Sequence, residues 1–128
     1  MMKLVNVTPH RVVITGFGSG VNYGETREIC VEPEAEPARL AEISEDLPNL
    51  ANNDNEWPDG VQFGVRRVRF SGIYGLPEPA EGTIYIASMA VAAEAARLGR
   101  EDVYSPDSSR AMRKDGFVQS VPSLVSWK

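Results

Sequence analysis

The sequence contains one cysteine, Cys30, and one histidine, His10. A single cysteine cannot form an intrachain disulfide or a cysteine-based metal cluster. A single histidine excludes zinc sites that need two or three histidines. We therefore expect no metal site. Cys30 is interpreted as a packing residue because no basic residue or helix start adjoins it in the sequence. A Cys30–His10 nucleophile pair is the alternative that the sequence leaves open.

Long apolar runs and cofactor motifs are also missing. The most apolar stretch, residues 84–96, contains Ser88 and Glu94 and is shorter than the about 20 residues that a membrane span needs. No basic segment followed by an apolar run opens the chain, so we expect no secretory signal. Neither a GxGxxG nor a GxxxxGK[ST] motif occurs. These absences predict a cytoplasmic protein without a cofactor or a membrane partner.

The remaining composition is that of an ordinary globular chain. Its 128 residues are 42% hydrophobic and 24% charged, which predicts one globular domain over residues 1–128. The formal net charge is −5, but residues 25–59 hold eleven acids against two arginines, or −9, which leaves +4 for the rest. Because nucleic-acid binders are usually basic, we expect no direct nucleic-acid binding.

The acidic stretch has two interpretations. It is either a solvated acidic loop, flexible over residues 45–60, or an acidic face that attracts a basic partner surface or mimics the charge of nucleic acid. For the second interpretation, the candidate partner-binding residues are three glutamates of the Pro-rich connector and one aromatic anchor: Glu32, Glu34, Glu36 and Trp57.

Residue patterns predict an α+β fold with a mixed sheet of about five to seven strands. One helix is expected over residues 89–98, capped by Ser88 and ended by Gly99, between strands 83–87 and 102–105 in a β-α-β unit. A C-terminal hairpin is expected at residues 110–121, turning at Asp115-Gly116. Residues 38–44 fit a strand or a short helix. The other expected strands are residues 3–7, 11–15, 27–31, 61–71 with a bulge at Arg66-Arg67, and 124–127.

A ligand site is conceivable where the strands of this unit end. Ligands in open α/β sheets lie beyond the carboxyl ends of strands, and a helix N-terminus favours an anion. The candidate residues for a small anionic, nucleotide-like ligand are Ser88, Ser105, Asp107, Arg110 and His10. The simpler interpretation is that Ser88 only caps the helix and that residues 107–109 form a polar turn.

The segment from Asn6 to His10 also has two interpretations. The His10 imidazole could act as a general base. Alternatively, Asn6, Thr8 and His10 hold a turn together by hydrogen bonds between side chains and backbone.

Three blocks of the sequence carry a resemblance to a known group of proteins. Asn6-Val-Thr-Pro-His10, Gly75-Leu-Pro-Glu-Pro and Gly82-Thr-Ile-Tyr-Ile-Ala-Ser88 resemble blocks of small proteins from tailed bacteriophages and their bacterial hosts, although Val7 stands where leucine is usual. The resemblance spans most of the chain and implies a phage or prophage accessory protein made in the bacterial cytoplasm. It implies no catalytic residue.

Three functions follow as hypotheses. The first is a non-enzymatic phage accessory protein that binds a host protein, such as a defence factor, through its acidic surface. The second is a protein that sequesters or processes a nucleotide-like anion. The third is a structural or virion protein that forms a homo-oligomer.

Overall fold

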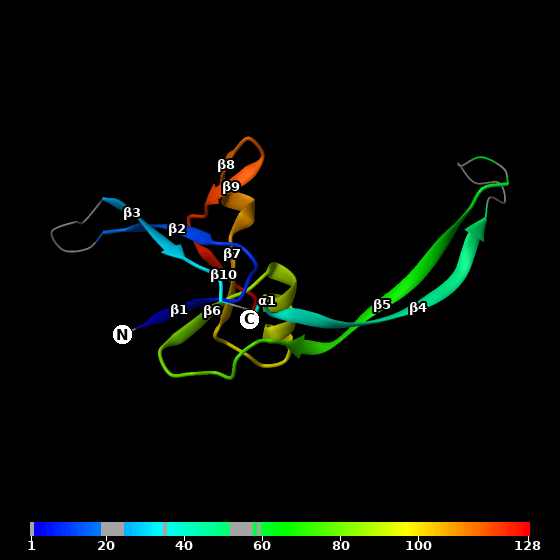
Figure 1. The fold of residues 1–128 in the computed structure, drawn as a ribbon, viewed down its shortest axis with the longest axis horizontal. Helices are drawn as coiled ribbons and strands as arrows, with labels where there is room; N and C mark the ends of the chain where they lie inside the picture. Colours follow the sequence, from blue (N-terminus) through cyan, green and yellow to red (C-terminus); the bar gives the residue numbers. More distant parts are fainter. Residues whose placement is uncertain (1, 19–24, 35, 52–57, 59) are drawn as a thin grey trace. The chain divides into compact units, whose positions relative to one another are not determined.

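Strands dominate the structure, a computed structural model that describes residues 2–18, 25–34, 36–51, 58 and 60–128 (Figure 1). One α-helix, α1 (Met89–Arg97), accompanies them, so the chain has the α+β composition that the sequence predicts. The chain divides into two compact units. Unit 1 comprises Met1–Arg39 and Ile73–Lys128, and unit 2 is Leu40–Gly72.

Unit 1 contains a four-stranded sheet. Its order is β1 (Lys3–Asn6), β6 (Thr83–Ile86), β7 (Val103–Pro106) and β10 (Leu124–Ser126). The first three strands are parallel and β10 is antiparallel to β7, so the sheet is mixed. The expected five to seven strands are too many, because the remaining strands pair in separate two-stranded sheets.

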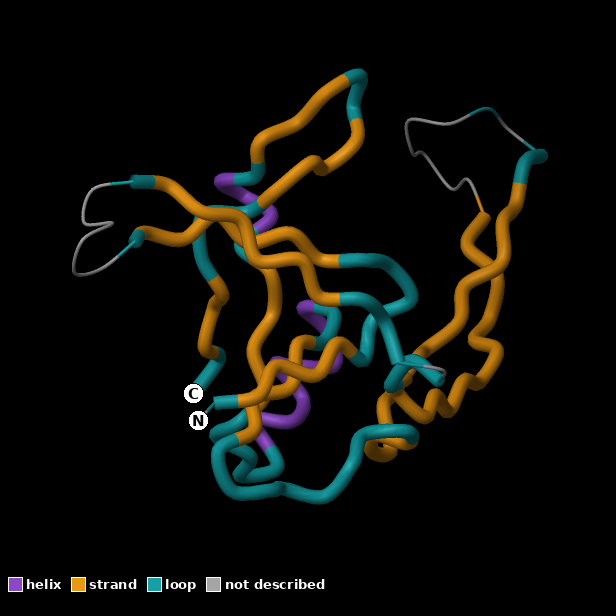
Figure 2. Tube along the Cα trace, turned by 60° about the vertical axis from the view of Figure 1, so that its left-hand side comes forward, coloured by secondary structure: helices purple, strands orange, loops and turns teal. Residues whose placement is uncertain are grey.

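The strands β2 (Val12–Phe17) and β3 (Thr26–Val31) form one of these separate sheets. Figure 2 shows this antiparallel hairpin leaving the turn that follows β1. The chain between β1 and β2 contains Pro9, which has no N–H to donate to a ladder. All six β2 residues then pair with β3, and only the isolated bridge Ile14–Val121 joins β2 to the C-terminal segment.

The helix α1 lies between β6 and β7 in the sequence and packs against β7. The Ser88 hydroxyl accepts a hydrogen bond from the Val91 N–H at 3.3 Å, as expected of an N-cap. Gly99 follows the helix at φ +95°, a conformation that favours glycine. The helix buries Val91, Ala92 and Ala95, so an alanine-rich face allows its close packing.

One buried cluster of unit 1 is made of branched aliphatic side chains. Val12, Ile14, Ile86 and Val121 form its centre. Partly buried apolar side chains surround them: Leu4, Val31, Ala111 and Leu124. This core joins β2 to β6, so apolar packing holds together two sheets that share no continuous ladder.

The Pro/Gly connector, residues 75–82, begins at a position that only glycine fits. Gly75 has φ +82°, and a Cβ there would lie 3.1 Å from the Pro37 carbonyl oxygen. Both the backbone conformation and the close approach therefore require glycine.

The predicted C-terminal hairpin is present. The strands β8 (Met112–Lys114) and β9 (Phe117–Ser120) pair antiparallel after the short 3-10 helix η2 (Ser108–Arg110). Asp115 and Gly116 both have positive φ, at 52° and 82°. Two such residues form the two-residue turn that matches the twist of paired strands.

Unit 2 contains most of β4 (Arg39–Ala51) and of β5 (Gln62–Tyr74), which form a two-stranded sheet. We call Leu40–Gly72 the ribbon. The strand alternative for residues 38–44 is confirmed. Residues 45–51 are part of β4, which continues through Pro48. The rest of the expected flexible stretch lies largely outside the described residues. The strand β5 includes Arg66-Arg67, the position at which the sequence predicts a bulge.

Candidate functional site

The five candidate ligand residues are distributed along one edge of the four-stranded sheet. His10 follows β1, Ser88 follows β6 and Asp107 follows β7, so parallel pairing brings the ends of these strands to the same edge. Arg110 ends η2, one turn after Asp107. Ser105 lies inside β7 rather than after it. Among the described residues, no hydrogen bond joins the side chains of His10, Ser88 and Asp107.

Three of these residues already form a side-chain hydrogen bond within the chain: Ser88, Ser105 and Asp107. Ser88 caps α1. Ser105 is 1% exposed, and its hydroxyl accepts a hydrogen bond from Trp127 Nε1 at 2.7 Å. The Asp107 carboxylate accepts hydrogen bonds from the hydroxyls of Ser109 at 2.8 Å and Ser123 at 3.0 Å. These contacts account for the three residues without a ligand.

The Asp107 carboxyl group is held in its ionised form. The Ser109 hydroxyl bond lowers its pKa most, burial opposes this, and the Ser123 bond and the Arg110 charge add smaller lowering effects. Asp107 therefore joins η2 to the segment before β10, and Arg110 acts on it through its charge. Arg110 itself is exposed.

The Asn6–His10 segment is a hydrogen-bonded turn, the second of its two interpretations. Asn6 is fully buried, and its amide group donates to the carbonyl oxygens of His10 at 2.7 Å and Val31 at 2.9 Å. Its side-chain oxygen accepts from the Thr8 N–H at 2.9 Å and the Thr8 hydroxyl at 2.7 Å. His10 is exposed, and the atoms with which it holds this turn are its backbone carbonyl oxygen and N–H.

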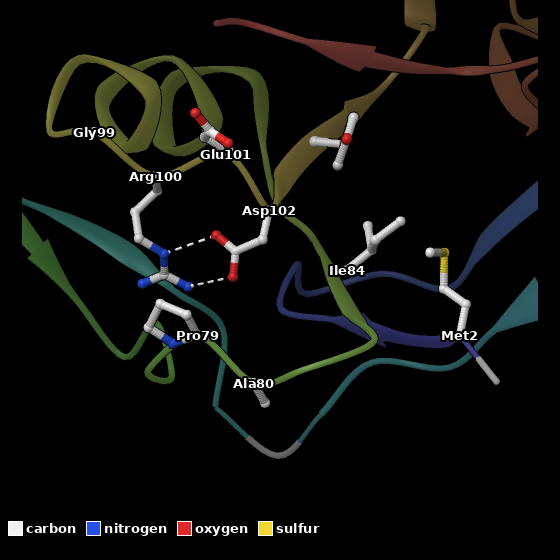
Figure 3. A pocket seen from close by; sticks show the side chains of 9 residues that line it. Met2, Pro79, Ala80, Ile84, Gly99, Arg100, Glu101 and Asp102 are labelled. Atoms are coloured by element: carbon white, nitrogen blue, oxygen red, sulfur yellow. Dashed lines mark hydrogen bonds and ion pairs between the residues drawn. The ribbon is translucent and has the colours of Figure 1, made fainter.

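A hollow of about 390 Å³ lies at the opposite, amino end of the parallel strands (Figure 3). Met2, Ile84 and Tyr104 form apolar parts of its wall, and Arg100 and Asp102 form a charged part. Figure 3 shows the Arg100 guanidinium facing the Asp102 carboxylate, with bonds of 2.8 and 3.0 Å.

This arginine links the hollow to the Pro/Gly connector. Arg100 also donates to the Pro77 carbonyl oxygen at 3.1 Å, and its guanidinium lies 5.7 Å from the centre of the Tyr85 ring. The Tyr85 hydroxyl donates to the Glu78 carbonyl oxygen at 2.9 Å. Hydrogen bonding to Arg100 lowers the pKa of Asp102 despite some burial, and the same bond raises the pKa of Arg100. The two charges thus neutralise each other. We call Arg100 and its contacts with Asp102, Pro77 and Tyr85 the Arg100 clamp, and its role is structural.

The acidic candidates lie in two settings. Glu32, Glu34 and Glu36 are exposed in the connector between β3 and β4, where Glu32 pairs with Arg11 at 3.7 Å. Trp57 lies outside the described residues. The other described acids of this stretch include Glu42, Glu45 and Asp46, which are exposed on β4.

The ribbon differs from unit 1 in that its described residues form no buried core. None of the described side chains in Leu40–Gly72 is buried. Six large apolar side chains there are substantially exposed: Ile43, Leu50, Val61, Phe63, Val68 and Phe70. The contacts within the ribbon include the Glu45–Arg67 ion pair at 2.8 Å and the bond from the Ser71 hydroxyl to the Ala41 carbonyl oxygen at 3.5 Å.

Sequence reasoning missed both the Arg100 clamp and the apolar content of the ribbon. Arg100 and Asp102 are separated by one residue, a spacing that carries little information by itself. The alternation of residues 61–71 predicts a strand with a bulge at Arg66-Arg67, but alternation by itself does not show that its apolar side chains stay exposed.

Comparisons with known proteins returned no matching family model, no matching curated protein and no matching solved structure. Among the described residues, no helix is long and apolar enough to cross a membrane. The same part of the chain holds no group of three or more potential metal-ligating side chains.

Proposed function

We propose that this protein is a non-enzymatic binding protein and that the ribbon, Leu40–Gly72, is the element with which it binds another protein chain. The observation that carries the proposal is that the described part of this compact unit has no buried side chain while exposing six large apolar ones. A two-stranded sheet of this kind is marginally stable in water by itself.

The form of the ribbon supports binding by strand addition. In a two-stranded sheet each strand has one edge without a strand partner, and an added chain can pair with the N–H and C=O groups there. Pairing along the edge would satisfy the backbone, and the exposed apolar side chains would be covered at the same time. A binding partner would therefore supply both backbone hydrogen bonds for the strand edge and cover for the apolar side chains.

The resemblance to bacteriophage proteins and the charge of the chain agree with this function. The exposed acids of the connector and of β4 would add long-range attraction toward a basic surface. A nucleotide-like ligand at the sheet edge has less support, because Ser88, Ser105 and Asp107 are occupied by partners within the chain.

Photo-crosslinking in bacterial cells tests this proposal. A photoreactive benzoylphenylalanine replaces Phe70, which lies in the ribbon and is 47% exposed, or Phe117, which lies in unit 1 and is 74% exposed. Phe117 is the matched control because it is the same residue type and is more accessible. We expect a discrete protein adduct at position 70, several-fold stronger than at position 117, and its loss when Val68→Asp is added.

Two results would contradict the proposal. The first is an adduct at position 70 that is no stronger than the adduct at position 117. The second is an adduct at position 70 that is unchanged when Val68→Asp is added. Circular dichroism of each variant separates these results from a failure to fold.

A further inference from the structure

We infer that the partner of the ribbon is a second copy of this chain, with the β4 edge of one copy pairing with the β5 edge of the next. This inference rests on the proposed binding role of the ribbon and adds the identity of the partner and the mode of contact. The pattern of charge on the two strands carries it.

The two strands of the ribbon have opposite charge. The strand β4 holds the acids Glu42, Glu45 and Asp46 after its first residue, Arg39. The strand β5 holds three arginines and no acid: Arg66, Arg67 and Arg69. Opposite charges directly across a strand pair are stabilising and like charges are destabilising.

Only part of this charge is used within one copy. Glu45 and Arg67 form an ion pair at 2.8 Å. Among the residues that the structure describes, Glu42 and Asp46 form no ion pair, and neither do Arg66 and Arg69. One copy therefore presents two unpaired carboxylates on β4 and two unpaired guanidinium groups on β5.

Strand geometry allows these groups to meet between copies. Glu42 and Asp46 are four residues apart, so they lie on the same face of β4. Arg66 and Arg69 both belong to β5, so a β4 strand that pairs with the β5 edge of a neighbour brings its own acids beside arginines that form no ion pair among the described residues of their copy.

The same charges disfavour the symmetric alternatives. Pairing β4 with β4 opposes acids with acids, and pairing β5 with β5 opposes arginines with arginines. Only the heterologous contact, β4 with β5, joins unlike charges. Such a contact leaves a free β4 at one end and a free β5 at the other, so repetition produces a closed ring or a filament.

The backbone supports the same contact. The strand β5 contains no proline. The strand β4 contains one, Pro48, which follows the acidic residues in the sequence. A proline is tolerated on an edge strand because its missing N–H can face away from the paired neighbour. Residues Arg39–Leu47 of β4 thus remain able to pair with β5 of the next copy, and the apolar side chains beside them would be covered.

A charge-exchange experiment on the full chain tests the inference by native mass spectrometry and light scattering. One variant carries Arg66→Glu with Arg69→Glu, and the other carries Glu42→Arg with Asp46→Arg. We expect an oligomer for the natural chain and, for each variant alone, association weakened on the order of 10-fold, since attraction between the acids of β4 and the arginines of β5 becomes repulsion. Mixing the two variants restores association, because each supplies the charge that the other needs. A chain with all four substitutions also associates.

The outcomes separate this inference from the proposal on which it rests. A natural chain that is monomeric at every concentration, while position 70 still crosslinks to a different protein, overturns the second-copy inference and leaves the binding role of the ribbon. An oligomer whose mass is unchanged in both charge variants, together with no crosslink at position 70, overturns both. Equal thermal midpoints of the variants in the monomeric state show that the ribbon and unit 1 still fold.

Discussion

Asn6→Ala should lower the free energy of unfolding by about 3–5 kcal/mol, the largest loss that we expect from a single polar substitution here. Asn6 is fully buried and makes four hydrogen bonds, two as donor and two as acceptor. Alanine would remove the donor to the Val31 carbonyl oxygen and the acceptor of the Thr8 N–H, while the Thr8 hydroxyl would keep its bond to the His10 carbonyl oxygen. Urea denaturation measures the loss.

The charged analogue Asn6→Asp separates the donor role from the acceptor role. A carboxylate keeps the bonds from Thr8 but faces the carbonyl oxygens of His10 and Val31, so its folded-state pKa should lie above its unfolded value. The native state then binds more protons than the unfolded state, and the stability of this variant relative to the natural chain should rise as the pH falls from 7 toward 4. A pH-independent loss would contradict this account. Asn49→Ala, on the exposed ribbon, is the control and should change stability by no more than about 0.5 kcal/mol.

Arg100→Ala should cost about 2–3 kcal/mol, between the values for exposed and fully buried ion pairs. The side chains of Arg100 and Asp102 are 20% and 21% exposed, so water screens them only in part. The substitution removes two bonds to Asp102, one to the Pro77 carbonyl oxygen and the contact over Tyr85. Arg100→Lys should also lose stability because an ammonium group cannot make the bidentate contact.

The pH dependence of this ion pair has a definite sign. The pKa of Asp102 is lowered in the folded state, so its contribution is present above the unfolded carboxyl pKa and is lost as the pH falls through the folded value. The stability difference between the natural chain and Asp102→Asn should therefore shrink in acid. Arg11→Ala, which breaks an ion pair with both side chains more than 60% exposed, is the control and should cost no more than about 0.5 kcal/mol at any pH. Equal losses for Arg11→Ala and Arg100→Ala would contradict the clamp.

The sequence carries enough local information to predict many of these elements. Ser88 and Gly99 delimit α1 because a hydroxyl N-cap and a glycine at positive φ are local requirements. Asp115-Gly116 predicts the C-terminal hairpin for the same reason. The Asn6–His10 turn was one of two open interpretations, and only the burial of Asn6 and the bond to Val31 decide between them.

Pairing between distant strands could not be predicted in the same way. The alternation of β2 and β3 is compatible with a large mixed sheet or with a separate hairpin, and the choice depends on which edge is free. The full length of β4 is hard to predict from sequence because proline and acidic residues are typical of loops. An edge strand nevertheless tolerates both Pro48 and the acids of β4. The contact between Arg100 and the Pro77 carbonyl joins residues 23 positions apart, so no local pattern indicates it.

Hydrogen–deuterium exchange of the natural chain in dilute and in concentrated solution tests the central claim most directly. The account predicts that amides of β4 and β5 exchange more slowly in concentrated solution, where copies pair along the ribbon edges, while β6, α1 and β7 exchange at the same rate in both. Protection that appears in unit 1 and leaves β4 and β5 unchanged would show that copies associate elsewhere and would contradict the assignment of the ribbon as the binding element.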